Sequence, residues 1–141
     1  LVPGANLVVA SAVALPFPDE RFDCVTLLDV IEHVRDADER RVLHEARRVL
    51  RPGGRLVIST NTDRSAVEWK HYRHYAPARF AALFEGLGEF RAVGLVPYFP
   101  TLRAWMQAPL VWRLFRARVR RCAPEAGQIV VGVGTKGGGA S

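Results

Sequence analysis

The sequence predicts an α/β domain with a parallel sheet, and three neighbouring segments carry that prediction. Residues 22–28 form an apolar run that is typical of a strand buried on both faces. A helical pattern begins at Asp36 and ends at a Pro-Gly-Gly turn, after which residues 55–60 form another apolar run. Strand, helix and strand in this order predict a right-handed βαβ unit.

Residues 6–12 predict one more strand ahead of this unit, because the run is apolar and has strand composition. The Pro-rich turn at residues 15–19 must end that strand, since Pro16 and Pro18 lack the amide hydrogen that a sheet ladder needs.

The helix that starts at Asp36 carries a capping signal and an apolar stripe. Glu39 stands three residues after Asp36, which predicts a capping box. Apolar residues recur at helical spacing and predict the buried face, namely Val42, Leu43, Ala46, Val49 and Leu50. The opposite face is predicted to hold Arg40, His44, Arg47 and Arg48.

The pattern further along predicts a helix, a strand, two helical pieces and a final strand. Residues 77–87 predict a helix that begins with Pro and turns Phe80, Leu83, Phe84 and Leu87 inward. Residues 90–96 and 128–134 predict strands. Between them, residues 102–121 predict two helical pieces broken at Pro109, and residues 137–141 predict a flexible Gly-rich tail.

The composition indicates one globular domain without a continuous basic surface for nucleic acid. The net charge is +6, but the basic residues spread along the chain among acidic ones, so nucleic acid is not an expected partner. No apolar run approaches the roughly 18 residues that cross a bilayer. Cys24 and Cys122 form neither a disulfide framework nor a metal pair, which favours a cytoplasmic setting.

A G-x-G-x-x-G pattern at residues 132–137 is predicted not to bind a nucleotide. That motif works only where it leaves a strand and opens a helix whose N–H groups meet the phosphate. Here the pattern runs into the Gly-rich end of the sequence, so a terminal strand is the better interpretation.

Four motifs follow one another along the chain, namely Leu15-Pro16-Phe17, Phe22-Asp23-Cys24-Val25, Glu32-His33-Val34 and the stretch from Glu45 to Gly54. In this order they resemble the landmarks of class I S-adenosylmethionine (SAM)-dependent methyltransferases, in the methyltransferase type 11 branch that includes the ubiquinone-biosynthesis type. The resemblance is strong over residues 6–60 and looser over 68–135. It implies a Rossmann-like sheet in the order 3-2-1-4-5-7-6 with the last strand antiparallel.

On that pattern residues 6–12 match the third strand, and the first two strands have no counterpart. The resemblance therefore implies an N-terminally truncated, partial methyltransferase domain over residues 1–136, with 98–121 as a helical cover segment. The Gly-rich loop after the first strand and the acidic residue after the second belong to the part without a counterpart. We expect this piece alone to be inactive.

The resemblance assigns a SAM surface to the ends of two strands. Ser11 and Ala12 end the first predicted strand, and Leu28 and Asp29 end the next. Ser11 stands where relatives carry an Asp that binds the adenine amino group, so its uncharged hydroxyl weakens this assignment. Two structural alternatives stay open, in which Ser11 caps the turn and Leu28 belongs to the core.

Asp29, Glu32 and His33 share one face if the chain turns helically there. Two carboxylates and an imidazole suit a divalent ion, and some relatives use a similar pattern for Mg²⁺. Glu32 and His33 are also the candidate catalytic pair, with His33 as a general base that needs no metal. The alternative is that both residues only brace the loop.

Residues 68–75 mix aromatic, imidazole and cationic groups and predict a lining for the acceptor pocket. The candidates are Trp69, His71, Tyr72, His74 and Tyr75. An amphipathic loop that covers the sheet edge is the alternative.

The expected function is methyl transfer from SAM to a small-molecule or lipid-like acceptor. The alternative is a non-catalytic methyltransferase-like module that contacts a partner or membrane through residues 102–121. Within it, residues 110–121 pair an apolar arc with Arg113, Arg116 and Arg120, a pattern that suits peripheral contact with anionic lipid. Packing of this arc on the chain's own domain stays open as the third reading.

Overall fold

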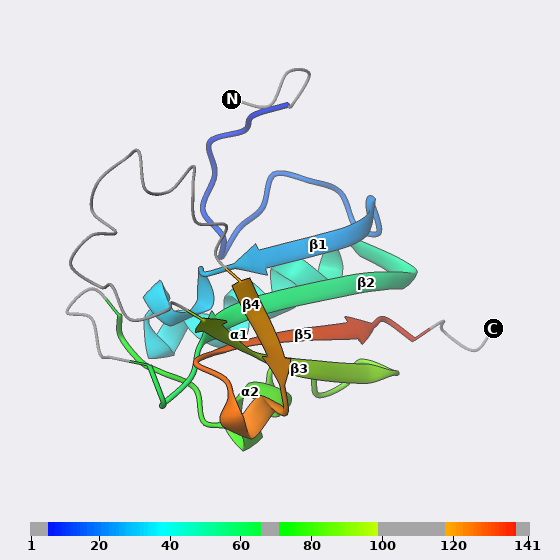
Figure 1. Cartoon of the computed structure of the whole chain (residues 1–141). Coiled ribbons are helices and arrows are strands. Elements are labelled where there is room, and N and C mark those ends of the chain that lie inside the picture. Colours follow the sequence, from blue (N-terminus) through cyan, green and yellow to red (C-terminus); the bar gives the residue numbers. More distant parts are fainter. Residues whose placement is uncertain (1–5, 66–70, 99–117, 138–141) are drawn as a thin grey trace.

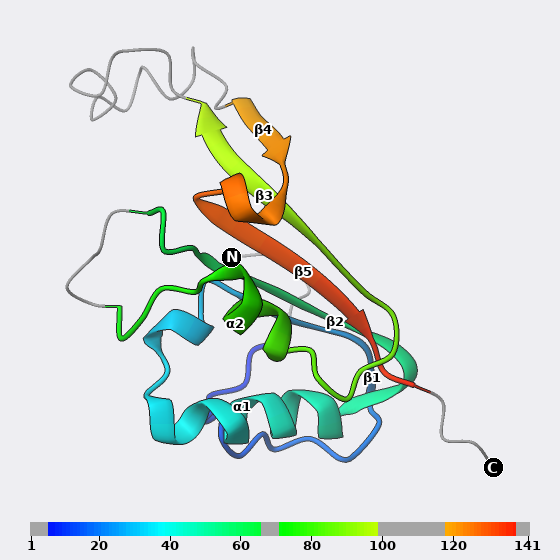
Figure 2. The same ribbon diagram turned by 90° about the horizontal axis from the view of Figure 1, so that it is seen from below.

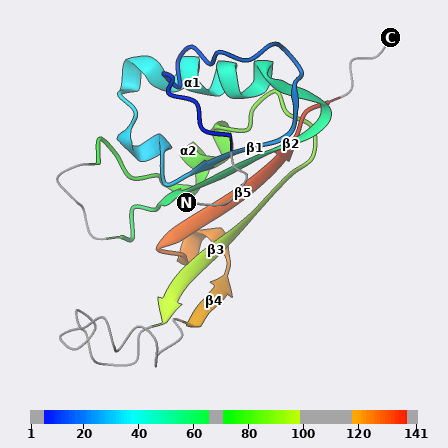
Figure 3. The ribbon, with the colours of Figure 1, turned by 90° about the horizontal axis from the view of Figure 1, so that it is seen from above.

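A computed structural model describes residues 6–65, 71–98 and 118–137. These residues form a single five-stranded sheet, and both α-helices pack against the same face of it (Figures 1 and 2). The view from above shows the same layering from the other side (Figure 3). The predicted α/β class is therefore confirmed.

The strand order in the sheet is β1-β2-β5-β3-β4. β1 (Phe22–Leu28) pairs in parallel with β2 (Leu50–Asn61), and β5 (Ile129–Thr135) runs antiparallel to β2. β3 (Phe90–Tyr98) pairs with the other edge of β5. The order β1-β2-β5-β3 corresponds to 4-5-7-6 of the expected methyltransferase sheet, and the predicted antiparallel last strand is confirmed.

The connection from β1 to β2 contains η1 (Ile31–His33), a single 3-10 turn, and α1 (Asp36–Arg48). The predicted stripe from Val42 to Leu50 is buried, because this face packs on the sheet. The predicted capping box is wrong. Arg35 is the N-cap and makes no side-chain cap bond, and the Glu39 carboxylate instead accepts hydrogen bonds from Arg73 and Tyr75.

Two arginines of α1 that were expected to face away are partly buried. Arg47 donates to the carbonyl of Leu83 at 2.8 Å. Arg48 forms two hydrogen bonds to the Glu45 carboxylate, at 2.7 and 2.9 Å, and a third to the carbonyl of Phe17. These contacts hold the Pro-rich turn at residues 15–19 against α1.

The second helix, α2 (Pro77–Ala82), is shorter than the predicted span, and the chain turns at Gly86 with φ +78°. Phe80, Leu83 and Phe84 are buried as predicted. A Cβ on Gly132 of β5 would lie 2.7 Å from the rings of Phe80 and Phe84. The glycine therefore makes room for the helix. Residues 136–137 have no regular structure.

Residues 6–12 do not form the predicted strand. Residues 6–10 have no regular structure, and Ser11 makes only an isolated bridge with Ala14. A strand needs a partner for its backbone groups, and among the described residues the outer edge of β1 carries none. The side chain of Leu7 is correspondingly 77% exposed.

The predicted helix over residues 102–121 is wrong at its end. Arg118–Cys122 form β4, which pairs antiparallel with β3 from Gly94 to Tyr98. Backbone pairing with β3 therefore overrides the helical period of that run. Residues 99–117 and 138–141 lie outside the described part of the chain. η2 (Pro124–Ala126) then leads into β5.

Candidate functional site

The candidate site lies where the two parallel strands end. β1 ends at Leu28 and β2 at Asn61, and in open α/β sheets ligands bind beyond the carboxyl ends of such strands. The segment of residues 71–75 returns to this edge. The amide of Tyr72 donates to the carbonyl of Glu32 at 2.9 Å, and the amide of Tyr75 donates to the carbonyl of Asn61 at 3.1 Å.

Leu28 and Asp29 form a turn at the end of β1. The Leu28 side chain is 56% exposed, so it is not plain core. Asp29 has φ +53°, a left-handed conformation that Asp tolerates better than most residues. Its amide donates to the carbonyl and to Oγ of Ser59, and the Ser59 hydroxyl donates to Asp29 Oδ1 at 3.1 Å. The carboxylate of Asp29 is thus held against β2.

Glu32 is completely buried although it is an acidic residue. Its Oε1 accepts one long hydrogen bond, 3.3 Å, from Nδ2 of Asn61. Its Oε2 has no hydrogen-bond partner among the described residues. A buried carboxylate is normally paired or bound to a metal, so this oxygen requires an explanation.

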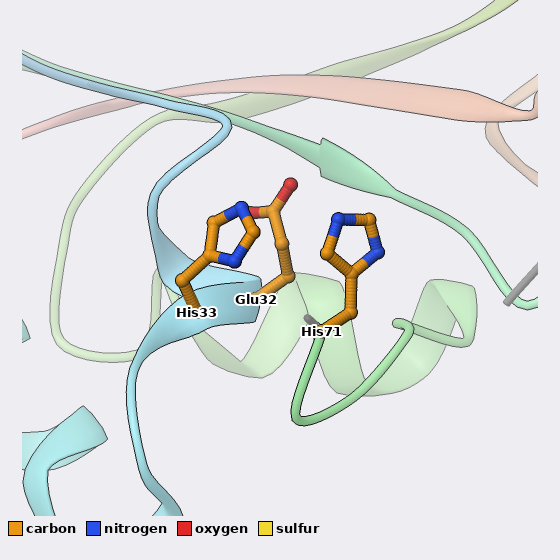
Figure 4. A group of neighbouring side chains, drawn as sticks. All are labelled: Glu32, His33 and His71. Atoms are coloured by element: carbon orange, nitrogen blue, oxygen red, sulfur yellow. The ribbon is translucent and has the colours of Figure 1, made fainter. Parts of the chain in front are cut away.

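Two histidines flank the Glu32 carboxylate, as Figure 4 shows. His33 is exposed and His71 is partly buried, and their ring centroids are 4.8 Å apart. One ligating atom from each of Glu32, His33 and His71 lies within 4.8 Å of the other two. Asp29 is not part of this group, so the structure does not bring together the Asp29, Glu32 and His33 set that was predicted for Mg²⁺.

His71 joins this cluster through the fold and not through any local spacing, so the sequence could not assign it there. Its Nδ1 lies 3.0 Å from Nε2 of His74, and either nitrogen can be the donor. The contact leaves Nε2 of His71 available to another group. Tyr72, between the two histidines, is exposed.

A second polar cluster joins Arg73 and Tyr75 to the first turn of α1. The Arg73 side chain is 6% exposed and forms ion pairs with Asp36 and Glu39, at 2.6 and 2.8 Å. The buried Tyr75 hydroxyl donates to Glu39 at 2.6 Å. Burial, reinforced by the hydrogen bond to Glu39, raises the pKa of Tyr75 well above its ordinary value. Tyr75 therefore lies in the core, with its hydroxyl engaged there and not turned toward a ligand.

The remaining predicted site residues are Ser11, Ala12 and Trp69. Ser11 is exposed, and Ala12 is partly buried against the core. Trp69 falls outside the described residues.

Comparison with known proteins agrees with this geometry. The family model described as "Methyltransferase domain" matches residues 2–58, which include the Pro-rich turn, β1, α1 and most of β2. This match supports the resemblance to class I SAM-dependent methyltransferases that the sequence motifs carry. Several curated proteins that are similar to this stretch are ubiquinone/menaquinone biosynthesis C-methyltransferases named UbiE.

Two of these relatives show how far the similarity extends. The ubiquinone/menaquinone biosynthesis C-methyltransferase UbiE of Hahella chejuensis is 53% identical over 53 residues, which cover 38% of this chain and 20% of that protein. The UbiE of Escherichia coli O1:K1 is 43% identical over 58 residues, which cover 41% and 22%. The matched stretch thus spans about a fifth of the length of these relatives.

Solved structures extend the match to almost the whole chain. A SAM-dependent methyltransferase of Thermotoga maritima, described as a possible histamine N-methyltransferase, has a TM-score of 0.71 and 26% identity. The match covers 94% of this chain and 65% of that one. A SAM-dependent methyltransferase of Archaeoglobus fulgidus has a TM-score of 0.67 at 14% identity, over 96% of this chain and 69% of that one, which shows the fold alone.

Proposed function

We propose that the protein to which this chain belongs transfers a methyl group from SAM to a small-molecule acceptor. The observation that carries the proposal is the sheet order β1-β2-β5-β3, with two parallel strands ending at one edge and an antiparallel last strand. This arrangement is the one that the resemblance to class I methyltransferases implies. The family match over residues 2–58 supports the same function.

The residues at the end of β1 fit one wall of a SAM site. Leu28 offers an exposed apolar surface, and Asp29 offers a carboxylate held in place by Ser59. Ser11 and Ala12 are proposed to contact the adenine side of the cofactor. The exposed hydroxyl of Ser11 is available as a hydrogen-bond acceptor.

The chemistry asks mainly for alignment. SAM supplies an electrophilic methyl group on a sulfonium, so the acceptor atom must lie in line with the methyl–sulfur bond. His33 is proposed to take up the proton that the acceptor loses, because its imidazole is exposed at the strand ends and histidine is a common general base. Glu32, fixed below it by Asn61, is proposed to orient this histidine.

The acceptor is proposed to be quinone-like or otherwise lipid-like. Support comes from the names of the UbiE relatives, which describe them as C-methyltransferases of ubiquinone and menaquinone biosynthesis. Trp69, His71, Tyr72 and His74 are the proposed acceptor lining, and the exposed Tyr72 ring provides an apolar surface for a flat ring to stack on. Within the described residues, no helix is long and apolar enough to cross a bilayer.

Calorimetric titration with SAM tests the proposal. The protein is prepared both as this chain and as a longer version that adds any in-frame coding sequence found upstream of residue 1. We expect the longer version to bind SAM, and Leu28→Lys to weaken that binding about tenfold or more, the equivalent of about 1.4 kcal/mol. Glu125→Gln on η2 is the matched control and should bind normally. A longer version that ignores SAM overturns the proposal.

The non-catalytic alternative through residues 102–121 stays a prediction, because residues 102–117 lie outside the described part of the chain.

A further inference from the structure

We propose that Glu32, His33 and His71 form a binding site for one divalent transition-metal ion of the zinc or cobalt type. The site is distinct from the Mg²⁺ set expected from the sequence, because it replaces Asp29 by a histidine from a separate segment. The proposal does not depend on methyl transfer, since metal binding is measured without SAM or acceptor. A His33 that binds the ion is a ligand and not the base proposed above, so metal binding replaces that role.

The first argument is the buried carboxylate. Glu32 is fully buried, and Oε2 has no hydrogen-bond partner among the described residues. The nearby guanidinium of Arg73 does not serve it, because that group pairs with Asp36 and Glu39. An ion bound at this carboxylate would supply the missing positive charge.

The second argument is the geometry. Zinc bound to imidazole and carboxylate at about 2.0–2.1 Å in a tetrahedron needs ligand atoms about 3.3 Å apart. In Glu32, His33 and His71 these atoms already lie within 4.8 Å of one another. Binding of the ion therefore requires these ligand atoms to move closer together. Three protein ligands leave a fourth position open for water or another ligand.

The third argument is the type of donor. Two imidazoles and one carboxylate suit zinc, cobalt or nickel, whereas Mg²⁺ prefers oxygen ligands alone. His74 adds a support of the kind that such sites use. If Nδ1–H of His71 donates to Nε2 of His74, the 3.0 Å contact fixes the tautomer that leaves Nε2 of His71 free to bind the ion. His74 is therefore a positioning residue.

Titration of the untagged protein with CoCl₂, followed by visible absorption, tests the site, and ZnCl₂ is then added as competitor. We expect one Co²⁺ per chain, displaced by Zn²⁺ and not by equal Mg²⁺. Loss of a residue that hydrogen-bonds to a metal ligand already lowers the affinity for the metal about 10–100-fold. Loss of a ligand itself should therefore lower it about 100-fold or more. That loss is expected for His33→Ala, His71→Ala and Glu32→Gln.

The chain offers matched controls. His44 is an exposed histidine on α1 outside the cluster, so His44→Ala should leave the affinity unchanged. Cys24 is an exposed thiol, and Cys24→Ser should likewise have no effect. His74→Ala should weaken binding about tenfold, and His74→Gln, which retains an acceptor, should recover most of that loss.

Several results would overturn the site. They are the absence of saturable Co²⁺ binding, a His33→Ala variant that binds within about threefold of the parent, or an equal loss in His44→Ala. Because His33 is exposed, its variant is not expected to disturb folding, and a circular dichroism spectrum identical to the parent's verifies this. Loss of binding in Asp29→Asn with retention in His71→Ala would also refute the ligand set.

Discussion

The segment of residues 71–75 meets the start of α1 in two polar clusters that differ in how their charges are used. In the Arg73 cluster, one guanidinium lies between the carboxylates of Asp36 and Glu39, and Tyr75 donates to Glu39. In the Glu32 cluster, a buried carboxylate lies between two imidazoles and keeps one oxygen without a partner. The first cluster pairs its cation with two carboxylates, although the Nε of Arg73 has no hydrogen-bond partner among the described residues, whereas the second leaves its carboxylate without an ion pair.

Replacing Arg73 by Ala should produce the largest effect. The change leaves Glu39 and Tyr75 with only the half-exposed Arg79 as a cation among the described residues, at 3.7 Å from Glu39. Breaking a buried pair costs about 3–5 kcal/mol. Since Asp36 is largely exposed, the loss should fall toward the lower end of that range. Urea unfolding measures the free energy, and Arg40→Ala, an exposed change on α1, should stay within about 0.5 kcal/mol of the parent.

If Arg73→Ala instead unfolds at the parent's urea midpoint, the cluster contributes no stability and the contrast between the two clusters disappears.

Tyr75→Phe removes only the hydroxyl from the same cluster and should cost about 1–2 kcal/mol. The pH dependence carries a further test. Burial holds the pKa of Tyr75 above its ordinary value of 10.0, so its protonated form stabilises the fold below that pH. Stability should fall as pH rises above 10, because the unfolded chain ionises first. This alkaline loss should be smaller in Tyr75→Phe, and thermal unfolding at pH 9 and 11 measures it.

Glu45 provides a charge cluster nearer the surface, where a smaller effect is expected. Hydrogen bonds from Arg48, followed by one from the amide of Leu15, lower the pKa of Glu45 to about 2. A lowered pKa contributes stability above the ordinary value of 4.5, and that contribution is lost as pH falls from about 4.5 toward about 2. Glu45→Gln should therefore flatten the acid limb of the stability curve.

The matched control for Glu45→Gln is Glu125→Gln, an exposed change on η2 that should leave the acid limb as steep as in the parent. Equal slopes for the parent and Glu45→Gln would show that the turn at residues 15–19 is held by other contacts.

The sequence predicted the central part of the fold because local patterns decide it. Phe22–Leu28 has the predicted bounds, and α1 begins at Asp36 with the predicted stripe buried. The strand predicted for residues 6–12 is absent because strand composition alone does not supply a pairing partner. The helix predicted up to residue 121 is wrong at its end for the opposite reason, since pairing with β3 overrides the helical period of this run.

The site was predictable only in pieces. Glu32 and His33 were expected at the end of a strand because polar residues follow an apolar run there. The place of His71 beside them depends on the return of the chain to the β2 end, where the Tyr72 amide meets the Glu32 carbonyl. No spacing in the sequence encodes that contact, so a loop histidine and a strand-end glutamate could not be joined in advance.

Glu32→Gln should have the smallest effect on stability, and for that reason it separates the two clusters best. With a chelator present, the change removes a buried charge that has one long hydrogen bond, so the free energy of unfolding should stay within about 1 kcal/mol of the parent or rise. With Zn²⁺ at about 100 times its dissociation constant, the parent should gain about 2.7 kcal/mol and the variant almost nothing. A loss above about 2 kcal/mol in the chelated variant would mean that the Glu32 carboxylate stabilises the fold as Arg73 does, and the distinction between the two clusters would fail.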